Sequence, residues 1–176
     1  MSTGVPTEDQ RRTAALQHIR QLGDPVLRTP SLDVDVFDEA LVDEIERMGE
    51  IMREARGVGL AAPQLGSLRR LIIIRPDEDG PIRALCNPNI VSYSDETDVD
   101  EEGCLSLAEL RFDVPRSTSI EVEAVDETGE AVEVAAEGFE ARVLQHEIDH
   151  LNGILIIDRA TPESRKSTLK TLRGSR

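Results

Sequence analysis

The chain has 176 residues, and the 39% that are hydrophobic are mostly aliphatic, with three Phe, one Tyr and no Trp. This length suits one compact domain whose core needs neither disulfides nor a metal to hold it together. The formal charge of −15 at pH 7 repels phosphates and anionic membranes, which argues against a non-specific binder of DNA or RNA. The two cysteines are too few for a disulfide framework and indicate a reducing compartment.

The sequence offers no candidate for a membrane span. Its longest apolar runs, such as Leu71 to Ile74 and Ile154 to Ile157, fall far short of the roughly 18 residues that a spanning helix requires. The first twenty residues lack the apolar stretch of a secretory signal, and they include Glu8 and Asp9, which transit peptides tend to avoid. We therefore expect a cytoplasmic protein.

The composition predicts three parts along the chain. Residues 1–20 are expected to form a flexible extension and the start of a first amphipathic helix, around Ala14 to Leu22. Residues 21–160 carry the periodic sequence of a folded domain. Residues 161–176 form a basic tail that holds both lysines of the chain, and a solvated terminal helix or a frayed end is expected there.

Two segments show the hydrophobic spacing of an amphipathic helix. The first runs from Asp38 to Ala55, and the second runs from Gly138 to Asn152, where Gly153 is well placed to end it. Short runs rich in β-branched and aliphatic residues predict strands. These runs are Leu71 to Ile74, Ala84 to Val91, Ile120 to Val125 and Ala131 to Ala135. The last two alternate apolar with acidic residues, which predicts a hairpin with one buried face.

The second predicted helix carries the sequence His146-Glu147-Ile148-Asp149-His150. Residues four apart share one face of a helix, so both imidazoles can reach one metal ion. The Glu147 carboxylate can then lie beside the water on that metal without being a ligand, which is the place for a general base. The alternative is a surface helix with incidental histidines, which this spacing around a glutamate disfavours.

A catalytic metal needs a third protein ligand and one open position for water. The best candidate is Cys104, which lies between Gly103 and Leu105-Ser106 in an acidic stretch. A single cysteine is more often an unreactive core residue. Cys86, among strand-forming residues, fits that interpretation better.

The segment from Gly57 to Gln64 is rich in glycine and small residues. It lacks the third glycine and the lysine of a phosphate-binding loop, so nucleotide binding is not expected. Small residues would let a substrate approach the backbone closely, and the Gln64 amide could donate a hydrogen bond to a developing oxyanion.

Taken together, Gly57 to Gln64, Glu102 to Ser106 and His146 to His150 resemble, in order and spacing, the three signature motifs of the peptide deformylases. The resemblance extends from about Gly23 to Arg159, so that residues 21–160 correspond to the catalytic domain. It implies a metal-dependent hydrolase that removes the N-formyl group from the formyl-methionyl N-termini of nascent polypeptides and releases formate. Pattern and resemblance together predict an α+β fold, with short antiparallel β-sheets packed around a central helix that carries the His-Glu-x-x-His motif.

The resemblance also implies one divalent metal ion, held at the positions of Cys104, His146 and His150. Fe2+ is characteristic of the family, and Zn2+, Ni2+ or Co2+ suit the same ligands. Two positions depart from the usual family pattern: Ala108, where Pro is common, and Ile156, where an aromatic residue is common. Neither position is a predicted ligand.

The family further implies roles for the residues around the metal. Gln64 and the backbone N–H of Leu105 would stabilise the oxyanion, and Glu147 would take a proton from water and return it to the leaving amine. Gly59 would bind the substrate main chain. Arg111 matches a basic position that the family often keeps near the substrate backbone, although a surface arginine fits the sequence equally well.

Two other functions remain open at this point. A zinc peptidase of the His-Glu-x-x-His type would not need the glycine-rich segment or the cysteine motif. A non-enzymatic relative with the same fold would not need the full set of catalytic residues. The basic tail adds a separate hypothesis, that it faces ribosomal RNA and brings the enzyme to the nascent chain.

Overall fold

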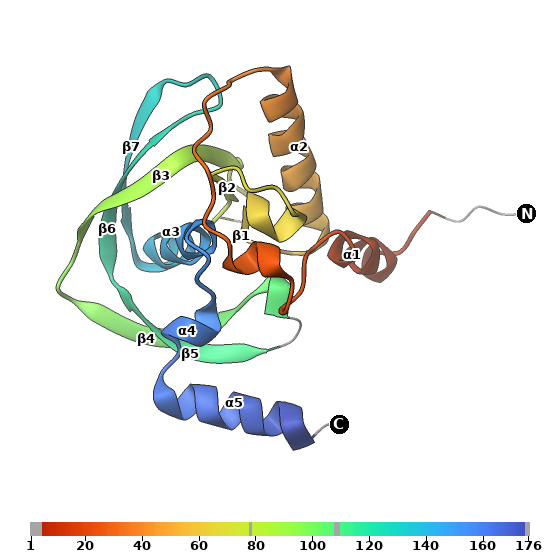
Figure 1. Ribbon diagram of the computed structural model, residues 1–176, viewed down its shortest axis with the longest axis vertical. Helices are drawn as coiled ribbons and strands as arrows, with labels where there is room; N and C mark the ends of the chain where they lie inside the picture. The colour runs from red at the N-terminus through yellow and green to blue at the C-terminus, as the bar shows by residue number, and fades with distance from the viewer. Residues whose placement is uncertain (1–4, 78, 108–109, 175–176) are drawn as a thin grey trace, which may run out of the picture.

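The computed structural model describes residues 5–77, 79–107 and 110–174, and in it a curved antiparallel sheet surrounds one central helix (Figure 1). The central helix, α3 (Gly138–Leu151), contacts four strands of this sheet and one strand of a second, smaller sheet. Another helix, α2 (Glu39–Glu54), packs against the end of the large sheet that β1 and β2 form. The architecture is the α+β arrangement that the sequence predicted.

All strand pairs within the two sheets are antiparallel. The five-stranded sheet has the order β1-β2-β3-β6-β7, formed by Gly59–Ala61, Leu71–Ile74, Arg83–Tyr93, Ser119–Val125 and Ala131–Glu137. The two-stranded sheet pairs β4 (Thr97–Gly103) with β5 (Arg111–Ser117). It lies below the large sheet in Figure 1, and Cys104 directly follows its first strand.

Shorter helices complete the structure. Three are 3-10 turns, η1 (Pro25–Arg28), η2 (Ala62–Leu65) and η3 (Leu105–Leu107). Three are α-helices, α1 (Glu8–Leu16), α4 (Ile156–Arg159) and α5 (Pro162–Gly174). A capping box between Thr7 and Gln10 starts α1, because the threonine hydroxyl satisfies a backbone N–H that has no partner within the helix.

Strand β2 is buried on both faces. Leu71 and Ile73 belong to the core under α2, whereas Ile72 and Ile74 belong to the core around α3. Successive side chains of a strand point to opposite faces, so these four residues contribute to two separate cores. This explains why β2 is a continuous apolar run and does not alternate.

The helices and strands predicted from periodicity are present with small changes at their ends. Helix α2, helix α3 and strand β2 begin and end within one residue of the expected positions. Helix α1 is an exception, because it spans Glu8–Leu16 and so begins and ends six residues before the expected stretch from Ala14 to Leu22. Strands β4 and β5 were not predicted, because β4 is acidic and largely exposed and β5 contains Pro115.

The C-terminal helix α5 is attached to the small sheet. The Ser164 hydroxyl accepts a hydrogen bond from the backbone N–H of Asp113 at 2.8 Å, and the Thr168 hydroxyl donates to the backbone oxygen of Arg111 at 3.0 Å. In this position α5 lies at the bottom of the view in Figure 1, away from α1 and α2.

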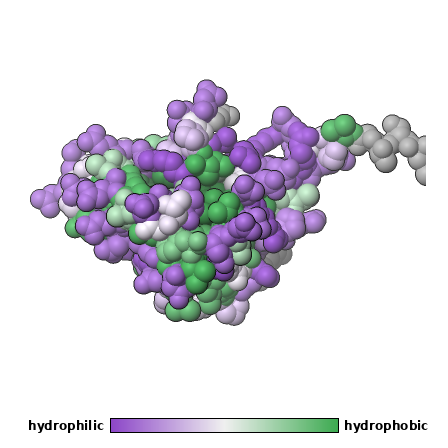
Figure 2. Space-filling model, turned by 90° about the horizontal axis from the view of Figure 1, so that it is seen from above, coloured by the Kyte–Doolittle hydropathy of each residue, from purple (hydrophilic) through white to green (hydrophobic). Residues whose placement is uncertain are grey.

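The surface is predominantly hydrophilic. Figure 2 shows charged and polar residues across the face seen from above, with hydrophobic residues between them. Among the described residues, no helix combines the length and the apolar character that crossing a membrane would require.

Candidate metal centre and active site

One cysteine and two histidines converge beside α3. His146 and His150 lie one turn apart on this helix, and their ring centroids are 5.0 Å apart in an edge-on arrangement. The Sγ of Cys104 lies 3.3 Å from Nε2 of His150. The ligand atoms of all three residues lie within 4.8 Å of one another. A thiolate and two imidazoles this close can hold one transition-metal ion and leave a position for water.

Two buried polar atoms of the site are left without a partner among the described residues. The Nδ1 of His150 and the Oε2 of Glu147 have no hydrogen-bond partner within the described part of the chain. Burial, together with the neighbouring His146, lowers the pKa of His150 well below its usual value. The ring is therefore neutral, which is the form that binds a metal. The cysteine, the two histidines and the neutral state of His150 fit a divalent cation.

Glu147 lies against the backbone of β1. Burial raises its pKa to about 7, although the charge of His146 opposes this shift. A Cβ at Gly59 would collide with the Glu147 carboxylate and would lie 2.8 Å from its Cγ. Only glycine leaves room for the glutamate here, so β1 and α3 together fix the position of this carboxylate.

Gln64, in η2, is oriented by hydrogen bonds at both ends of its amide. Its oxygen accepts from the backbone N–H of Ala61 at 3.0 Å, and its Nε2 donates to the Ser106 hydroxyl at 3.1 Å. The same Nε2 lies 3.7 Å from Sγ of Cys104. The amide nitrogen of Gln64 is therefore directed toward the metal ligands.

Leu105 is the first residue of η3 and follows Cys104 directly. A backbone N–H at this position has no acceptor within its own helix, so it is available to a ligand. A cavity of about 290 Å3 opens beside this turn. The predicted site residues that line the cavity are Gly59, Gln64, Cys104, Leu105, Arg111, His146 and Glu147.

His150 lies behind that cavity, in contact with Cys104. The structure thus brings all eight predicted site residues to one place. Arg111 lies over Gly103, where a Cβ would collide with its guanidinium group. Of the two departures from the family pattern, Ile156 is buried beside Leu155 in the small core that includes Cys104, and Ala108 lies outside the described residues.

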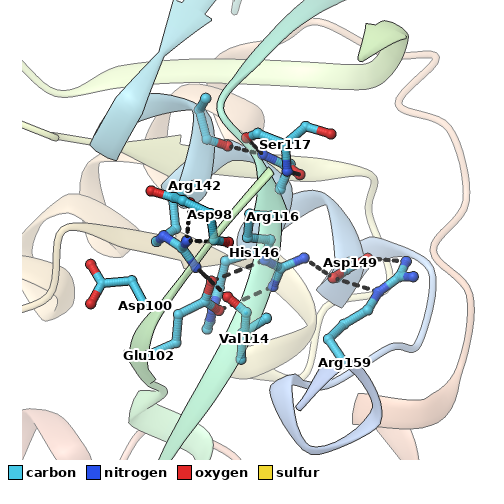
Figure 3. Close-up of polar contacts among 12 residues, drawn as sticks. Asp98, Asp100, Glu102, Val114, Arg116, Ser117, Arg142, His146, Asp149 and Arg159 are labelled. Atoms are coloured by element: carbon cyan, nitrogen blue, oxygen red, sulfur yellow. Dashed lines mark hydrogen bonds and ion pairs between the residues drawn. The ribbon is translucent and has the colours of Figure 1, made fainter. Parts of the chain in front are cut away.

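Sequence reasoning missed a network of buried charges behind His146, shown in Figure 3. Glu102 accepts hydrogen bonds from Arg116, Arg142 and His146. Asp149 accepts from Arg116 and from Arg159. Burial alone would raise the pKa of Glu102, but the hydrogen bonds from His146 and Arg116 lower it to about 2.

One signal for this network was present in the sequence. Arg142 precedes His146 by four residues and therefore lies on the same face of α3. Arg116 comes from β5, a strand that was not predicted, and no local pattern connects it to the metal ligands.

Known proteins are similar to this chain in both sequence and fold. The family model described as polypeptide deformylase matches residues 16–166. A peptide deformylase of Thermotoga maritima is 48% identical over 157 residues, which are 89% of this chain and 94% of that protein. One from Clostridium botulinum is 48% identical over 147 residues, which are 84% of this chain and 98% of that protein.

Solved structures agree with these matches. The crystal structure of the Thermotoga maritima peptide deformylase has a TM-score of 0.79 at 49% identity and covers 82% of this chain and 97% of its own. A peptide deformylase from Synechococcus elongatus, solved in complex with actinonin, has a TM-score of 0.82 at 39% identity, with 87% and 85% covered. Since sequence and fold agree over most of its length, this chain belongs to the peptide deformylase family, the metal-dependent hydrolases that remove the N-formyl group from nascent chains.

Proposed function

We propose that this hydrolase acts with one Fe2+ ion held by Cys104, His146 and His150. The observation that carries the proposal is the position of their three ligand atoms, within 4.8 Å of one another and next to Glu147. Zn2+, Ni2+ and Co2+ fit the same donors, and Fe2+ is preferred because it is characteristic of the family. When bound, such an ion lowers the pKa of a water molecule and polarises the formyl oxygen.

Glu147 is proposed as the group that moves protons. It receives one from the attacking water and delivers it to the amine that leaves. Because burial raises its pKa to about 7, the carboxylate can hold a proton and release it again near neutral pH. Because Gly59 has no side chain, Glu147 can lie close to the cavity, and the outer edge of β1 is left for the substrate main chain.

Gln64 and Leu105 are proposed to stabilise the oxyanion that forms at the formyl carbon. The Gln64 amide is already directed toward the ligands by Ala61 and Ser106, so little reorganisation is needed during the reaction. In the best-studied case, one such donor contributes about 2.7–4 kcal/mol of transition-state stabilisation. Two donors therefore supply several kcal/mol. Arg111, at the rim of the cavity, is proposed to bind the substrate backbone.

The proposed partners are formyl-methionyl N-termini and the ribosome, in the cytoplasm. The chain carries an overall charge of −15, yet α5 presents exposed Lys166 and Lys170 one turn apart. A basic face on an acidic protein favours an encounter with RNA in one orientation.

The test is formate release from formyl-Met-Ala-Ser by protein purified without oxygen, with metal content measured on the same sample. Formate release with bound iron is expected, and Glu147→Ala is expected to keep the metal and lose the activity. His146→Ala is expected to lose the metal. Activity in Glu147→Ala would contradict the role of Glu147, and full metal content in His146→Ala would contradict the ligand assignment.

A further inference from the structure

Both oxygens of the Glu102 carboxylate are fully engaged in hydrogen bonds. Oε1 accepts from Nε of Arg116 and from Nη1 of Arg142, each at 2.9 Å. Oε2 accepts from Nη2 of Arg116 at 3.0 Å and makes a contact of 3.1 Å with Nδ1 of His146. A carboxylate offers about four acceptor positions, so these contacts leave Glu102 no freedom to rotate.

This carboxylate sets the tautomer and the orientation in which the His146 ring would bind a metal. Because an ionised carboxylate can only accept, the hydrogen in the contact with His146 must be on Nδ1. The contact with Glu102 uses Nδ1, so Nε2 is the nitrogen left to bind a metal, on the side of Cys104 and His150. Partners of this kind fix both the tautomer and the orientation of a metal-binding histidine.

Arg142 connects Glu102 to the rest of the site. It lies one turn before His146 on α3, and its side chain is only 7% exposed. Besides Glu102, it donates to the backbone oxygen of Val114 in β5 at 2.8 Å and to the carboxylate of Asp98 in β4 at 2.5 Å. One guanidinium group therefore joins α3, which carries two proposed ligands, to the small sheet that leads into Cys104 (Figure 3).

Arg116 makes a similar bond to Glu102 but has a second task. Its Nη1 donates to buried Asp149 at 2.5 Å, so removing it would leave two buried carboxylates without their main partner, which is strongly destabilising. Arg142 can be changed with Arg116 still in place on Glu102. The two arginines are therefore not equivalent as experimental targets.

We propose that Arg142 is a positioning residue for the metal centre, which acts through Glu102 to hold the His146 ring at a fixed distance from Cys104. This inference rests on the proposed ligands Cys104, His146 and His150. It assigns Arg142 no contact with the metal or with the reacting atoms. Its effect is expected on metal binding itself and on the geometry of the bound ion.

The experiment measures Co2+ affinity by competition with a chelator, and records the visible absorption of the bound Co2+, whose bands report ligand geometry. Arg142→Met is expected to bind Co2+ about 10-fold more weakly, the lower end of the loss that is typical when the direct partner of a ligand is removed, because Glu102 itself stays in place, and its bands are expected to shift. Arg142→Lys keeps the charge but not the planar fork, so an intermediate loss is expected.

Two control variants separate positioning from general stability. Arg159→Met removes another arginine of the network, one that donates to Asp149 at 2.8 Å and has no bond to Glu102 among the described contacts. Asp98→Asn removes the charge of the exposed partner of Arg142. Both are expected to keep the Co2+ affinity and spectrum of the unchanged protein.

Several results would overturn the inference. Unchanged Co2+ affinity and bands in Arg142→Met would do so, as would an equal loss in Arg159→Met. If Arg142→Met fails to fold, Arg142→Lys becomes the test. An unchanged Co2+ affinity and an unchanged Co2+ spectrum in that variant would also contradict the proposal. His146→Ala serves as the reference, since unchanged affinity there would show that the ligand assignment is wrong rather than the role of Arg142.

Discussion

Gly59 and Glu147 show how one missing methyl group can define an active site. The glutamate occupies the space that a Cβ at position 59 would need. The sequence predicted both residues as part of the site, but their contact became visible only when β1 was placed against α3. Glycine at position 59 is thus required by packing, independently of any contact with substrate.

Gly59→Ala is expected to lower kcat about 100-fold, because displacing a catalytic group by about 1 Å has an effect of this size. Metal content is expected to stay unchanged, since Glu147 is not a proposed ligand. Gly57→Ala is the matched control, because the three atoms nearest to a Cβ there are Cδ1 of Leu105 at 3.0 Å, Cγ of Met52 at 3.3 Å and the backbone oxygen of Gly59 at 3.4 Å, and none of them belongs to Glu147. Formate release and metal content measured on both variants check this, and equal activity in the two would contradict it.

Glu147 should also give the metal-free protein a specific pH dependence. Its pKa is raised from 4.5 to about 7 in the folded state. Its neutral form therefore stabilises the folded protein fully below pH 4.5, and this contribution is lost as the pH rises through about 7. The change amounts to about 3 kcal/mol between the two limits.

Glu147→Gln stays neutral at every pH and should not show this loss. Urea unfolding of both metal-free proteins between about pH 5 and pH 8 measures the difference. The glutamine variant is expected to gain stability relative to the unchanged protein as the pH rises. If the unfolding free energies of the two proteins changed in parallel with pH, the raised pKa of buried Glu147 would be contradicted.

At the scale of elements, α3 depends on how its C-terminal end is closed. Gly153 has a φ of +71°, and a Cβ there would lie 2.6 Å from the backbone oxygen of Arg28. Its N–H donates to the backbone oxygen of His150, a proposed ligand. Gly153 therefore connects the end of α3, next to the proposed ligand His150, with the backbone at Arg28.

Gly153→Ala is expected to destabilise the protein by about 2 kcal/mol or more, since backbone strain of about 1–3 kcal/mol is combined with a steric collision. Gly23→Ala is the control, because Gly23 also has a positive φ, +107°, but a Cβ there would meet no atom within 4 Å. Thermal unfolding of both variants separates the two effects. Equal losses would show that the collision with Arg28 is relieved.

The helix α5 allows a test of the proposed ribosome contact. Deleting it would also remove the hydrogen bonds of Ser164 and Thr168 to β5, so charge reversal is the cleaner change. Lys166→Glu with Lys170→Glu is expected to weaken co-sedimentation with ribosomes and to reduce its dependence on salt. Arg47→Glu with Arg53→Glu, on the exposed side of α2, makes the same change in net charge elsewhere. Equal pelleting of both double variants at low salt would contradict a role for α5.

Hydrophobic periodicity predicted the helices and strands whose own apolar residues enter a core. Helix α2 and strand β2 were predicted within one residue because their apolar pattern matches the cores that they enter. Strand β4 has only Glu102 buried among its seven residues, so its pairing with β5 determines its conformation. The Arg116 bond to Glu102 depends on that pairing, which is why no sequence pattern revealed it.

At the scale of the whole molecule, the order of the three motifs carried more information than any motif alone. The His-Glu-x-x-His sequence left a zinc peptidase open, and only its combination with Cys104 and the glycine-rich segment indicated a deformylase. The family match over residues 16–166 decides between these functions.

The position of β2 has a consequence for how the molecule unfolds. Its alternate residues enter the cores under α2 and around α3, so neither helix can detach without exposing one face of the same strand to water. The two cores are thereby coupled into one cooperative unit. Backbone amides of β2 are therefore expected to exchange with solvent only when the entire molecule opens, and β1, whose Gly59 lines the pocket, is paired directly with this strand.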